Sequence, residues 1–258
     1  MGDVPPSHPR YASLMSRKKL VDASNDGLLA DSALIAHGRG EAFDYLLGEK
    51  TSTVAMQAIE EVVALLLKAK NPVLSLNGNT TALAGAELIA CAAVLQCPIE
   101  LNIYYRTPER MEVLFKFLNS IRGCAKELLP EALHSQVDDV PILGMSPDDS
   151  IPNLEGPRAA CHSDGILSAD VILVPLEDGD RCEALMAMEK SICVIDLNPL
   201  SRTAQMATVT IVDELTRCAP LILNSLIKNN SEINEEWDNM DNLQKSLNIM
   251  LRNLNEHD

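Results

Sequence analysis

The chain has 258 residues, of which 47% are hydrophobic and only 3% aromatic, so its core must be built from aliphatic side chains. A formal net charge of −16 argues against nucleic acid or an anionic membrane as partner, because both attract basic surfaces. No apolar run appears long enough for a membrane span, no apolar signal segment is present, and the seven cysteines form no CxxC pair, which predicts a cytoplasmic protein with reduced thiols.

Residues 1–50 are expected to form helix and loop, and they contain the stretch LIAHGRGEAFDYLLGEK at 34–50. This stretch lacks the spacing of a Walker A loop, and Phe43 stands where the dinucleotide fingerprint needs its third glycine. His37 could act as a base or be an ordinary hydrogen-bonded residue. No HExxH or GxSxG motif is present, so zinc and serine hydrolases are poor alternatives.

From residue 51 onward, apolar strands alternate with amphipathic helices, which is typical of a parallel sheet. The residues between 124 and 157 are rich in proline and acidic side chains, and we expect a linker with at most short helices. The pattern predicts strands at 72–76, 99–105, 170–176, 191–197 and 208–213, and helices at 55–69, 81–95, 107–123, 181–190 and 214–228.

The tail at 229–258 is polar, but apolar residues recur in it at steps of three and four, which favours an amphipathic helix that packs on the body or on a partner subunit. These residues are Met240, Leu243, Leu247, Met250 and Leu254. We therefore expect one α/β domain over 1–228, followed by a helical tail.

Four predicted strands end in polar clusters, and ligands of parallel sheets bind beyond the carboxyl ends of the strands. Such loops can be polar merely because they are exposed. However, each cluster mixes Arg, Asp, Asn and Gly in a short space, which favours one shared site. The residues are Asn77 and Asn79; Arg106; Asp178, Asp180 and Arg181; and Asp196, Asn198 and Arg202.

Each cluster has a chemical and a structural interpretation. Asp178 and Asp180 could share Mg²⁺ or hold an amine, or Asp180 could simply cap the next helix. Asp196 could bind ribose, Asn198 a base edge and Arg202 a phosphate, although Asn-Pro also starts ordinary turns.

Arg106 and Arg110 lie four residues apart and could grip an anion, or Arg110 could pair with Glu109 or Glu112 in solvent.

Several long strings resemble the archaeal phosphopantothenate synthetase family (4-phosphopantoate–β-alanine ligase). They are VPPSHPRYASLMSR at 4–17, the stretch at 34–51, NGN with ELNIYYRTPER, ADVILVPLEDGDR at 169–181 and IDLNPLSRTA at 195–204. The resemblance runs from about residue 4 to 220 and covers neither the linker over 124–150 nor the tail.

The resemblance implies a Rossmann-like homodimer without a P-loop. It implies that ATP, 4-phosphopantoate and β-alanine give 4'-phosphopantothenate, AMP and diphosphate through an acyl adenylate, in coenzyme A synthesis. Mg²⁺ would accompany ATP. The residues that match the family's ATP contacts are Arg17, Arg39, Asp196, Leu197, Asn198, Arg202, Thr203, Glu214 and Leu215.

One position departs from the family pattern, because the chain reads VDE at 212–214 where the family usually has VDN, so a backbone contact is the safer expectation for Glu214. Asn77, Asn79, Arg106, Asp178, Asp180 and Arg181 are our candidates for phosphopantoate, Mg²⁺ or β-alanine. With the resemblance in hand, we interpret Gly38 and Gly40 as a tight backbone turn that presents Arg39 to a nucleotide phosphate, with Glu41 and Asp44 orienting its guanidinium or starting the following helix.

Two rival functions stay open. One is an ATP-dependent ligase for a different amino acid, and the other is a nucleotide-binding regulator without turnover. Release of AMP and diphosphate separates an enzyme from a regulator, and a survey of amines separates the two ligases.

Overall fold

The computed structural model describes residues 4–255, with side chains described over 4–253. Its centre is a sheet of six parallel strands in the order β3-β2-β1-β6-β7-β8. The strands are β1 (Pro72–Leu76), β2 (Ile99–Leu101), β3 (Ile142–Leu143), β6 (Val171–Pro175), β7 (Ser191–Ile195) and β8 (Val209–Ile211). A small antiparallel ribbon pairs β4 (Asp149–Ser150) with β5 (Ala160–Cys161).

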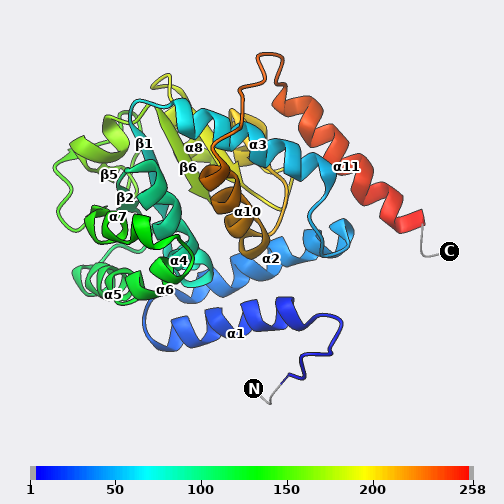
Figure 1. Ribbon diagram of the computed structural model, residues 1–258, viewed down its shortest axis with the longest axis horizontal. Coiled ribbons are helices and arrows are strands. Elements are labelled where there is room, and N and C mark those ends of the chain that lie inside the picture. The colour runs from blue at the N-terminus through cyan, green and yellow to red at the C-terminus, as the bar shows by residue number, and fades with distance from the viewer. Residues whose placement is uncertain (1–3, 256–258) are drawn as a thin grey trace.

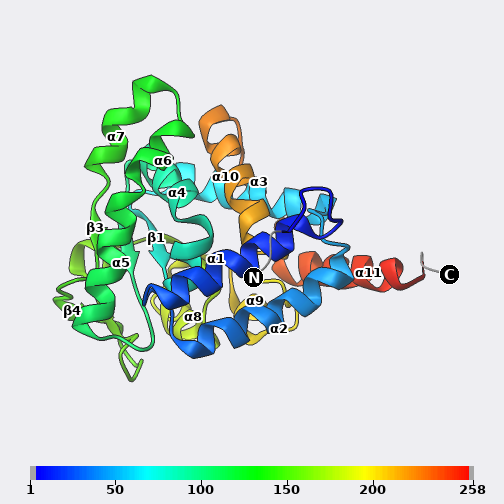
Figure 2. The ribbon, with the colours of Figure 1, turned by 90° about the horizontal axis from the view of Figure 1, so that it is seen from below.

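Helices cover both faces of this sheet, and the helices at 11–25 and 31–47 lie side by side across its carboxyl edge (Figures 1 and 2). The longer helices are α1 (Tyr11–Asn25), α2 (Asp31–Leu47), α3 (Thr53–Lys68), α4 (Gly78–Leu95), α5 (Pro108–Ser120), α8 (Gly179–Met186), α10 (Leu215–Lys228) and α11 (Asn239–Asn255). The shorter ones are α6 (Arg122–Glu127), η1 (Glu131–Leu133), α7 (His134–Asp139), η2 (Ser163–Leu167) and α9 (Arg202–Met206).

The strand order confirms the predicted α/β fold of Rossmann-like type. From β1 the chain first builds outward to β2 and β3, then returns to the other side of β1 and adds β6, β7 and β8. The order of the strands therefore reverses between β1 and β6, which is where such sheets open a crevice for ligands.

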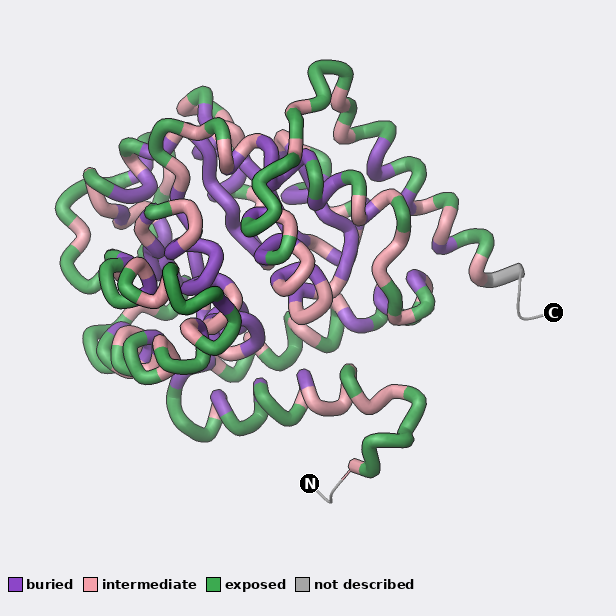
Figure 3. Tube along the Cα trace, in the orientation of Figure 1, coloured by how far each residue is buried: buried purple, intermediate pink, exposed green. Residues whose placement is uncertain are grey.

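The core is aliphatic, as the composition requires. α3, α4 and α10 pack over one face of the sheet, and burial concentrates there and in the central strands (Figure 3). A second cluster lies on the opposite face around β6, β7 and α8. Six of the seven thiols are buried and only Cys124 is exposed; all seven are free.

α4 is long and apolar enough to cross a membrane by length and composition, in contrast to our expectation from the sequence. However, 72% of this 18-residue window is buried inside the fold. The helix is apolar all round because it lies between the sheet and α10, and a core helix of this kind passes the same test.

Several predicted boundaries were wrong. The strand predicted at 99–105 ends at Leu101, and Tyr104 and Tyr105 that follow are exposed. The predicted stop at Gly123 is wrong because α6 begins at Arg122. The linker also contributes β3, an edge strand that pairs with β2.

The tail forms the predicted helix, and it packs on the body of the same chain. α11 lies at the β8 edge of the sheet, where Leu243 and Met250 are buried against α2 and α9. Asn239 Oδ1 accepts a hydrogen bond from the Thr210 amide at 2.9 Å, and Asn242 Nδ2 donates to the Thr210 carbonyl at 2.8 Å. Side-chain amides thus satisfy the free edge of β8. The side chain of Leu254 lies outside the described part.

Candidate functional site

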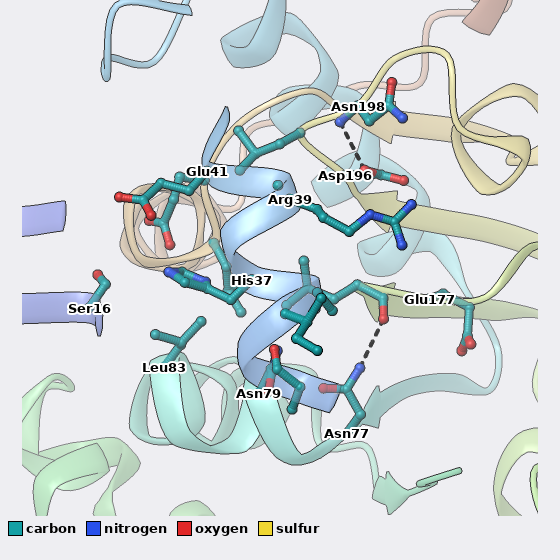
Figure 4. Close-up of a pocket in the computed structure, with 18 of the residues that line it drawn as sticks. Ser16, His37, Arg39, Glu41, Asn77, Asn79, Leu83, Glu177, Asp196 and Asn198 are labelled. Carbon is teal, nitrogen blue, oxygen red and sulfur yellow. Dashed lines mark hydrogen bonds between the residues drawn. The ribbon is translucent and has the colours of Figure 1, made fainter. Parts of the chain in front are cut away.

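A cavity of about 800 Å³ opens at the carboxyl edge of the sheet. Loops that follow β1, β2, β6, β7 and β8 form one wall, and α1 and α2 form the other (Figure 4). Three of the four polar clusters that follow predicted strands contribute predicted residues to the lining, and the segment after β2 contributes Arg110 in place of Arg106. The predicted site residues that line the cavity are His37, Arg39, Asn77, Asn79, Asp178, Asp196, Leu197, Asn198, Arg202, Thr203, Glu214 and Leu215.

The loop after β7 is a tight turn around the half-buried carboxylate of Asp196. Asp196 Oδ1 accepts a hydrogen bond from the Asn198 amide at 2.9 Å, and its other oxygen accepts one from the Ser201 hydroxyl. Burial raises the pKa of Asp196, and these two hydrogen bonds oppose that rise. Leu197 packs between α2 and α9, so the turn is fixed from both sides.

The loop after β8 begins α10 with Glu214 as N-cap. Its carboxylate accepts from the Thr216 amide at 2.7 Å, and burial raises the pKa of Glu214. Beside it, Arg217 pairs with Asp213 and reaches across to Asp44 on α2. This pairing outweighs desolvation and raises the pKa of the Arg217 guanidinium. An ion-pair network therefore ties α2 to the strand-end wall.

The loop after β6 contains a strained residue, since Leu176 adopts a φ of 58°, a conformation that costs a branched residue about 1–2 kcal/mol. Asn77 Nδ2 donates to the Leu176 carbonyl at 3.0 Å and helps to hold it. The next residue, Glu177, has a side chain with 0% exposure between Arg158 and Arg181. Arg181 in turn donates to the Ser75 hydroxyl at 3.1 Å, which links β6 to β1.

Arg158 comes from the loop between β4 and β5 and bridges the ends of two strands. Its Nε donates to Asn102 Oδ1 at 3.0 Å, and its terminal nitrogens lie 2.7 Å from Glu177 Oε1 and 2.6 Å from Asp178 Oδ2. Arg158 lines the cavity, and these partners follow β2 and β6, the strands on either side of β1.

The two candidate asparagines after β1 behave differently. Asn77 caps α4, accepting from the Thr80 amide at 3.0 Å, so both of its polar atoms already have protein partners. Asn79 donates to the Ala33 carbonyl at 3.1 Å, but its Oδ1 is buried and has no hydrogen-bond partner among the described residues. An unpaired buried acceptor in a cavity wall is available to a ligand donor.

The stretch at 34–50 is not a glycine turn. It lies in α2, and Gly38 and Gly40 occupy its interior, so the tight turn we expected there was wrong. The physical reason is that the apolar residues of this stretch pack at helical spacing, with Leu47 buried against α11 and Phe43 packed beside it. The left-handed glycine comes at the end of the helix, where Gly48 has a φ of 75°.

α2 nevertheless presents Arg39 to the cavity, where its side chain extends toward Asp196 and Glu177 (Figure 4). Arg39 is exposed and makes no hydrogen bond or ion pair with any residue in the described part of the chain. His37 points the other way, toward Ser16 and Glu41, and burial lowers its pKa.

Glu41 and Asp44 do not orient Arg39. Glu41 is buried and accepts from Arg10 at 2.9 Å and from Arg17 at 2.9 Å, which joins α1 to α2, while Asp44 binds Arg217. Arg17 is thus paired with Glu41 and does not line the cavity.

Three more predicted residues lie outside the cavity lining. Arg106 donates to the Gly144 carbonyl, and Arg181 is buried beneath Glu177. Asp180 pairs with Arg202, which also binds Glu183. Asp180 is not the N-cap of α8, because that position belongs to Asp178.

Asp178 and Asp180 therefore face different arginines. Over the described residues, no group of three or more His, Cys, Asp or Glu side chains converges as a metal site.

Sequence analysis missed Arg158 and Glu177, and it left Arg110 between two interpretations. Arg110 lines the cavity and donates to the carbonyls of Tyr105 at 2.6 Å and Leu28 at 3.2 Å, so it pairs with neither Glu109 nor Glu112. Burial lowers its pKa. Glu177 belonged to the quoted EDGDR cluster, and a carboxylate directly after a buried strand was the signal for it.

Most of the chain is similar in sequence to one protein family. The family model described as phosphopantothenate/pantothenate synthetase matches residues 54–254, which includes the linker and most of the tail that carried no recognisable motif. Three archaeal relatives are each named 4-phosphopantoate–β-alanine ligase. Those of Thermococcus onnurineus and Thermococcus kodakarensis are 46% identical over 220 residues, covering 85% of this chain and 78% of theirs.

The third relative, from Methanospirillum hungatei, is 45% identical over 214 residues, covering 83% of this chain and 81% of its own. A family model that spans 54–254 and relatives of this identity leave one conclusion: the chain belongs to the phosphopantothenate/pantothenate synthetase family.

Proposed function

We propose that this protein is an ATP-dependent ligase that condenses 4-phosphopantoate with β-alanine to give 4'-phosphopantothenate, AMP and diphosphate, a step of coenzyme A synthesis. The observation that carries the proposal is that Arg39, which has no partner among the described residues, lines the same cavity as the strand-end turn at Asp196, in a member of this family. A volume of about 800 Å³ lies toward the upper end of the range for small-molecule sites and suits two ligands.

ATP binds, in this proposal, along the side of the cavity formed by the loops after β7 and β8. Asp196 accepts from ribose hydroxyls, Asn198 contacts the base, and the backbone at Glu214 and Leu215 completes the nucleoside site. Glu214 is suited to a backbone role because its carboxylate already caps α10. Arg39 binds the phosphates, and Arg202 can exchange its exposed carboxylate partners for a phosphate.

The acid and the amine bind on the side formed by the loops after β1, β2 and β6. Arg110 offers a guanidinium whose partners among the described residues are backbone carbonyls, so its charge is free to attract an anion. Asn79 Oδ1 offers an acceptor to a hydroxyl or an ammonium group.

The reaction proposed needs no protein nucleophile. The pantoate carboxylate attacks the α-phosphate of ATP and releases diphosphate, and the amine of β-alanine then attacks the mixed anhydride and releases AMP. The chain has to neutralise the phosphate charge, align the reactants and keep water from the anhydride. Arg39 supplies the charge, and α1 and α2 cover the cavity.

Mg²⁺ enters the proposal only as a companion of ATP. The described residues provide no three-ligand cluster, which fits an ion held mainly by phosphate oxygens and water. We assign no step to it. The cytoplasmic location and the homodimer that the family resemblance implies are also proposals; light scattering that finds a mass of one chain would contradict the dimer.

The test is an assay with ATP, 4-phosphopantoate and β-alanine, in which AMP, diphosphate and phosphopantothenate are each measured. We expect all three in equal amounts, and none without the acid. Nucleotide binding without AMP release would indicate a regulator. Substitution of other amines, such as glycine and γ-aminobutyrate, tests the choice of amino acid, because a faster reaction with one of them would indicate a different ligase.

A further inference from the structure

Arg158 is held by two carboxylates that differ sharply in their exposure to water. The side chain of Glu177 is 0% exposed, whereas that of Asp178 is 56% exposed. The side chain of Arg158 is 10% exposed, and the residue lines the cavity. One nitrogen therefore has a buried partner and another has a partner at the surface of the cavity.

The buried contact fixes the position of the guanidinium. Glu177 also binds the fully buried Arg181, and Asn102 accepts from Arg158 Nε. If the Arg158 guanidinium moved away from Glu177, the buried carboxylate would lose one of its two cations where water cannot replace it, and this would cost free energy. Arg158 is thus oriented before any ligand arrives.

The exposed contact is easily exchanged. An ion pair open to water contributes little to stability, because water screens the charges and the side chain loses freedom when it pairs. Asp178 is the N-cap residue of α8, yet its carboxylate makes no capping hydrogen bond and reaches Arg158 instead. Nothing else in the described structure requires the Asp178 carboxylate to stay on Arg158.

The place of this pair fits an anionic ligand. Arg158 contacts Asn102 after β2 and Asp178 after β6, the strands on either side of β1, and the same cavity is lined by Arg110, which has no carboxylate partner among the described residues. Two guanidiniums, one uncompensated and one paired with an exposed carboxylate, make this side attractive to carboxylate or phosphate oxygens.

We propose that Arg158 binds an anionic group of the acid substrate, and that Asp178 occupies the guanidinium in the free protein and is displaced when the acid binds. Asp178 is then a competitor of the ligand and has no role as a metal ligand. This inference rests on the proposed function for the identity of the acid.

The experiment measures the equilibrium dissociation constant of 4-phosphopantoate by calorimetry, without ATP or β-alanine, so that no turnover is needed. Asp178→Asn keeps the shape and removes the competing charge, and we expect binding to tighten by about 2- to 5-fold, as loss of an exposed ion pair implies. Asp241→Asn is the matched control, since the side chain of Asp241 is also 56% exposed and pairs with a cation, Lys245 on α11, outside the cavity lining; it should leave the constant unchanged.

Arg158→Gln should weaken acid binding by about 10- to 100-fold, the loss expected for a hydrogen bond to a charged group. If that variant does not fold, Arg158→Lys keeps a cation beside Glu177 and should still weaken binding. Measuring the binding of pantoate, which lacks the phosphate, shows which anionic group of the acid Arg158 binds. Equal loss for both acids assigns the carboxylate to Arg158, and loss for 4-phosphopantoate alone assigns the phosphate.

Unchanged or weaker binding by Asp178→Asn would overturn the proposal, because Asp178 would then not compete with the acid. Unchanged binding by a folded Arg158 variant would also overturn it. Neither result touches the proposed function, which fails only if the wild-type protein does not form AMP and phosphopantothenate in the assay above.

Discussion

The two walls of the cavity each supply charged side chains, and Glu177 on one wall and Arg39 on the other are held in opposite ways. On the strand-end wall, Glu177 and Asp213 have fully buried carboxylates, each bound to at least one arginine. On the α2 wall, Arg39 is exposed and unpaired within the described structure, although Asp44 of the same helix is buried and paired with an arginine. Removing a buried, paired carboxylate should therefore matter most for stability, and removing Arg39 should matter most for activity.

The largest effect on the free energy of unfolding is expected for the buried carboxylate of Glu177. Glu177→Ala leaves Arg158 and Arg181 without their shared carboxylate, and loss of one partner from a buried ion pair costs about 3–5 kcal/mol. Urea unfolding measures the free energy. The matched control is Glu183→Ala on the exposed side of α8, which should change it by less than about 1 kcal/mol. Equal stability of both variants would show that burial does not distinguish them.

Arg39→Ala tests the other wall. We expect AMP formation to fall by a factor of about 100 or more, because a positioned donor that stabilises transition-state charge contributes that much, while the urea midpoint stays the same. Arg252→Ala is the control, since Arg252 is also an exposed arginine but lies on α11 away from the cavity. Near-normal turnover of a folded Arg39 variant would remove this residue from the site.

A smaller effect is expected where the two walls meet. Asp44→Asn removes one of the two carboxylates on Arg217 and should cost about 2 kcal/mol in the free energy of unfolding, the size of a hydrogen bond to a charged group. Denaturant titration gives the value. If Asp44→Asn is as stable as wild type, Asp213 alone suffices and α2 is held to α10 by apolar packing.

The smallest effect is expected at the exposed pair of Asp180 and Arg202. Asp180→Asn should change stability by less than about 1 kcal/mol, and the change should shrink further in high salt, because both side chains are open to water. Thermal unfolding at two salt concentrations measures it. A cost close to that of Glu177→Ala would mean that this exposed pair stabilises the fold as strongly as a buried pair does.

Local pattern was sufficient for the centre of the sheet. The strand predicted at 72–76 has the bounds of β1, and β6 and β7 lie within the predicted ranges, because each is a continuous apolar run buried on both faces. Prediction failed beyond the central runs. β2 ends at Leu101, one residue before Asn102, whose amide still donates to the Leu76 carbonyl at 2.9 Å and whose side chain donates to the carbonyls of Arg158 and Ala160.

The residues of the site also differ in whether they could be predicted from local pattern. The turn at Asp196 could be read from the sequence because its partners, Asn198 and Ser201, lie within five residues. Arg158 could not, because its partners come from residues 102, 177 and 178. Its loop also carries no pattern that separates it from any other exposed turn.

By itself, the sequence determined the aliphatic core, the alternation of strands and helices, the family and the polar strand ends, because each of these depends on residue type and short spacing. Only the tertiary structure decided which arginines are already paired. Among the described residues, Arg17 faces a buried carboxylate and Arg39 faces none. Arg158 has one buried and one exposed carboxylate partner, and the carboxylates on Arg202 are exposed. The availability of a charge to a ligand depends on partners that are distant in the chain and on their access to water, and neither can be read from neighbouring residues.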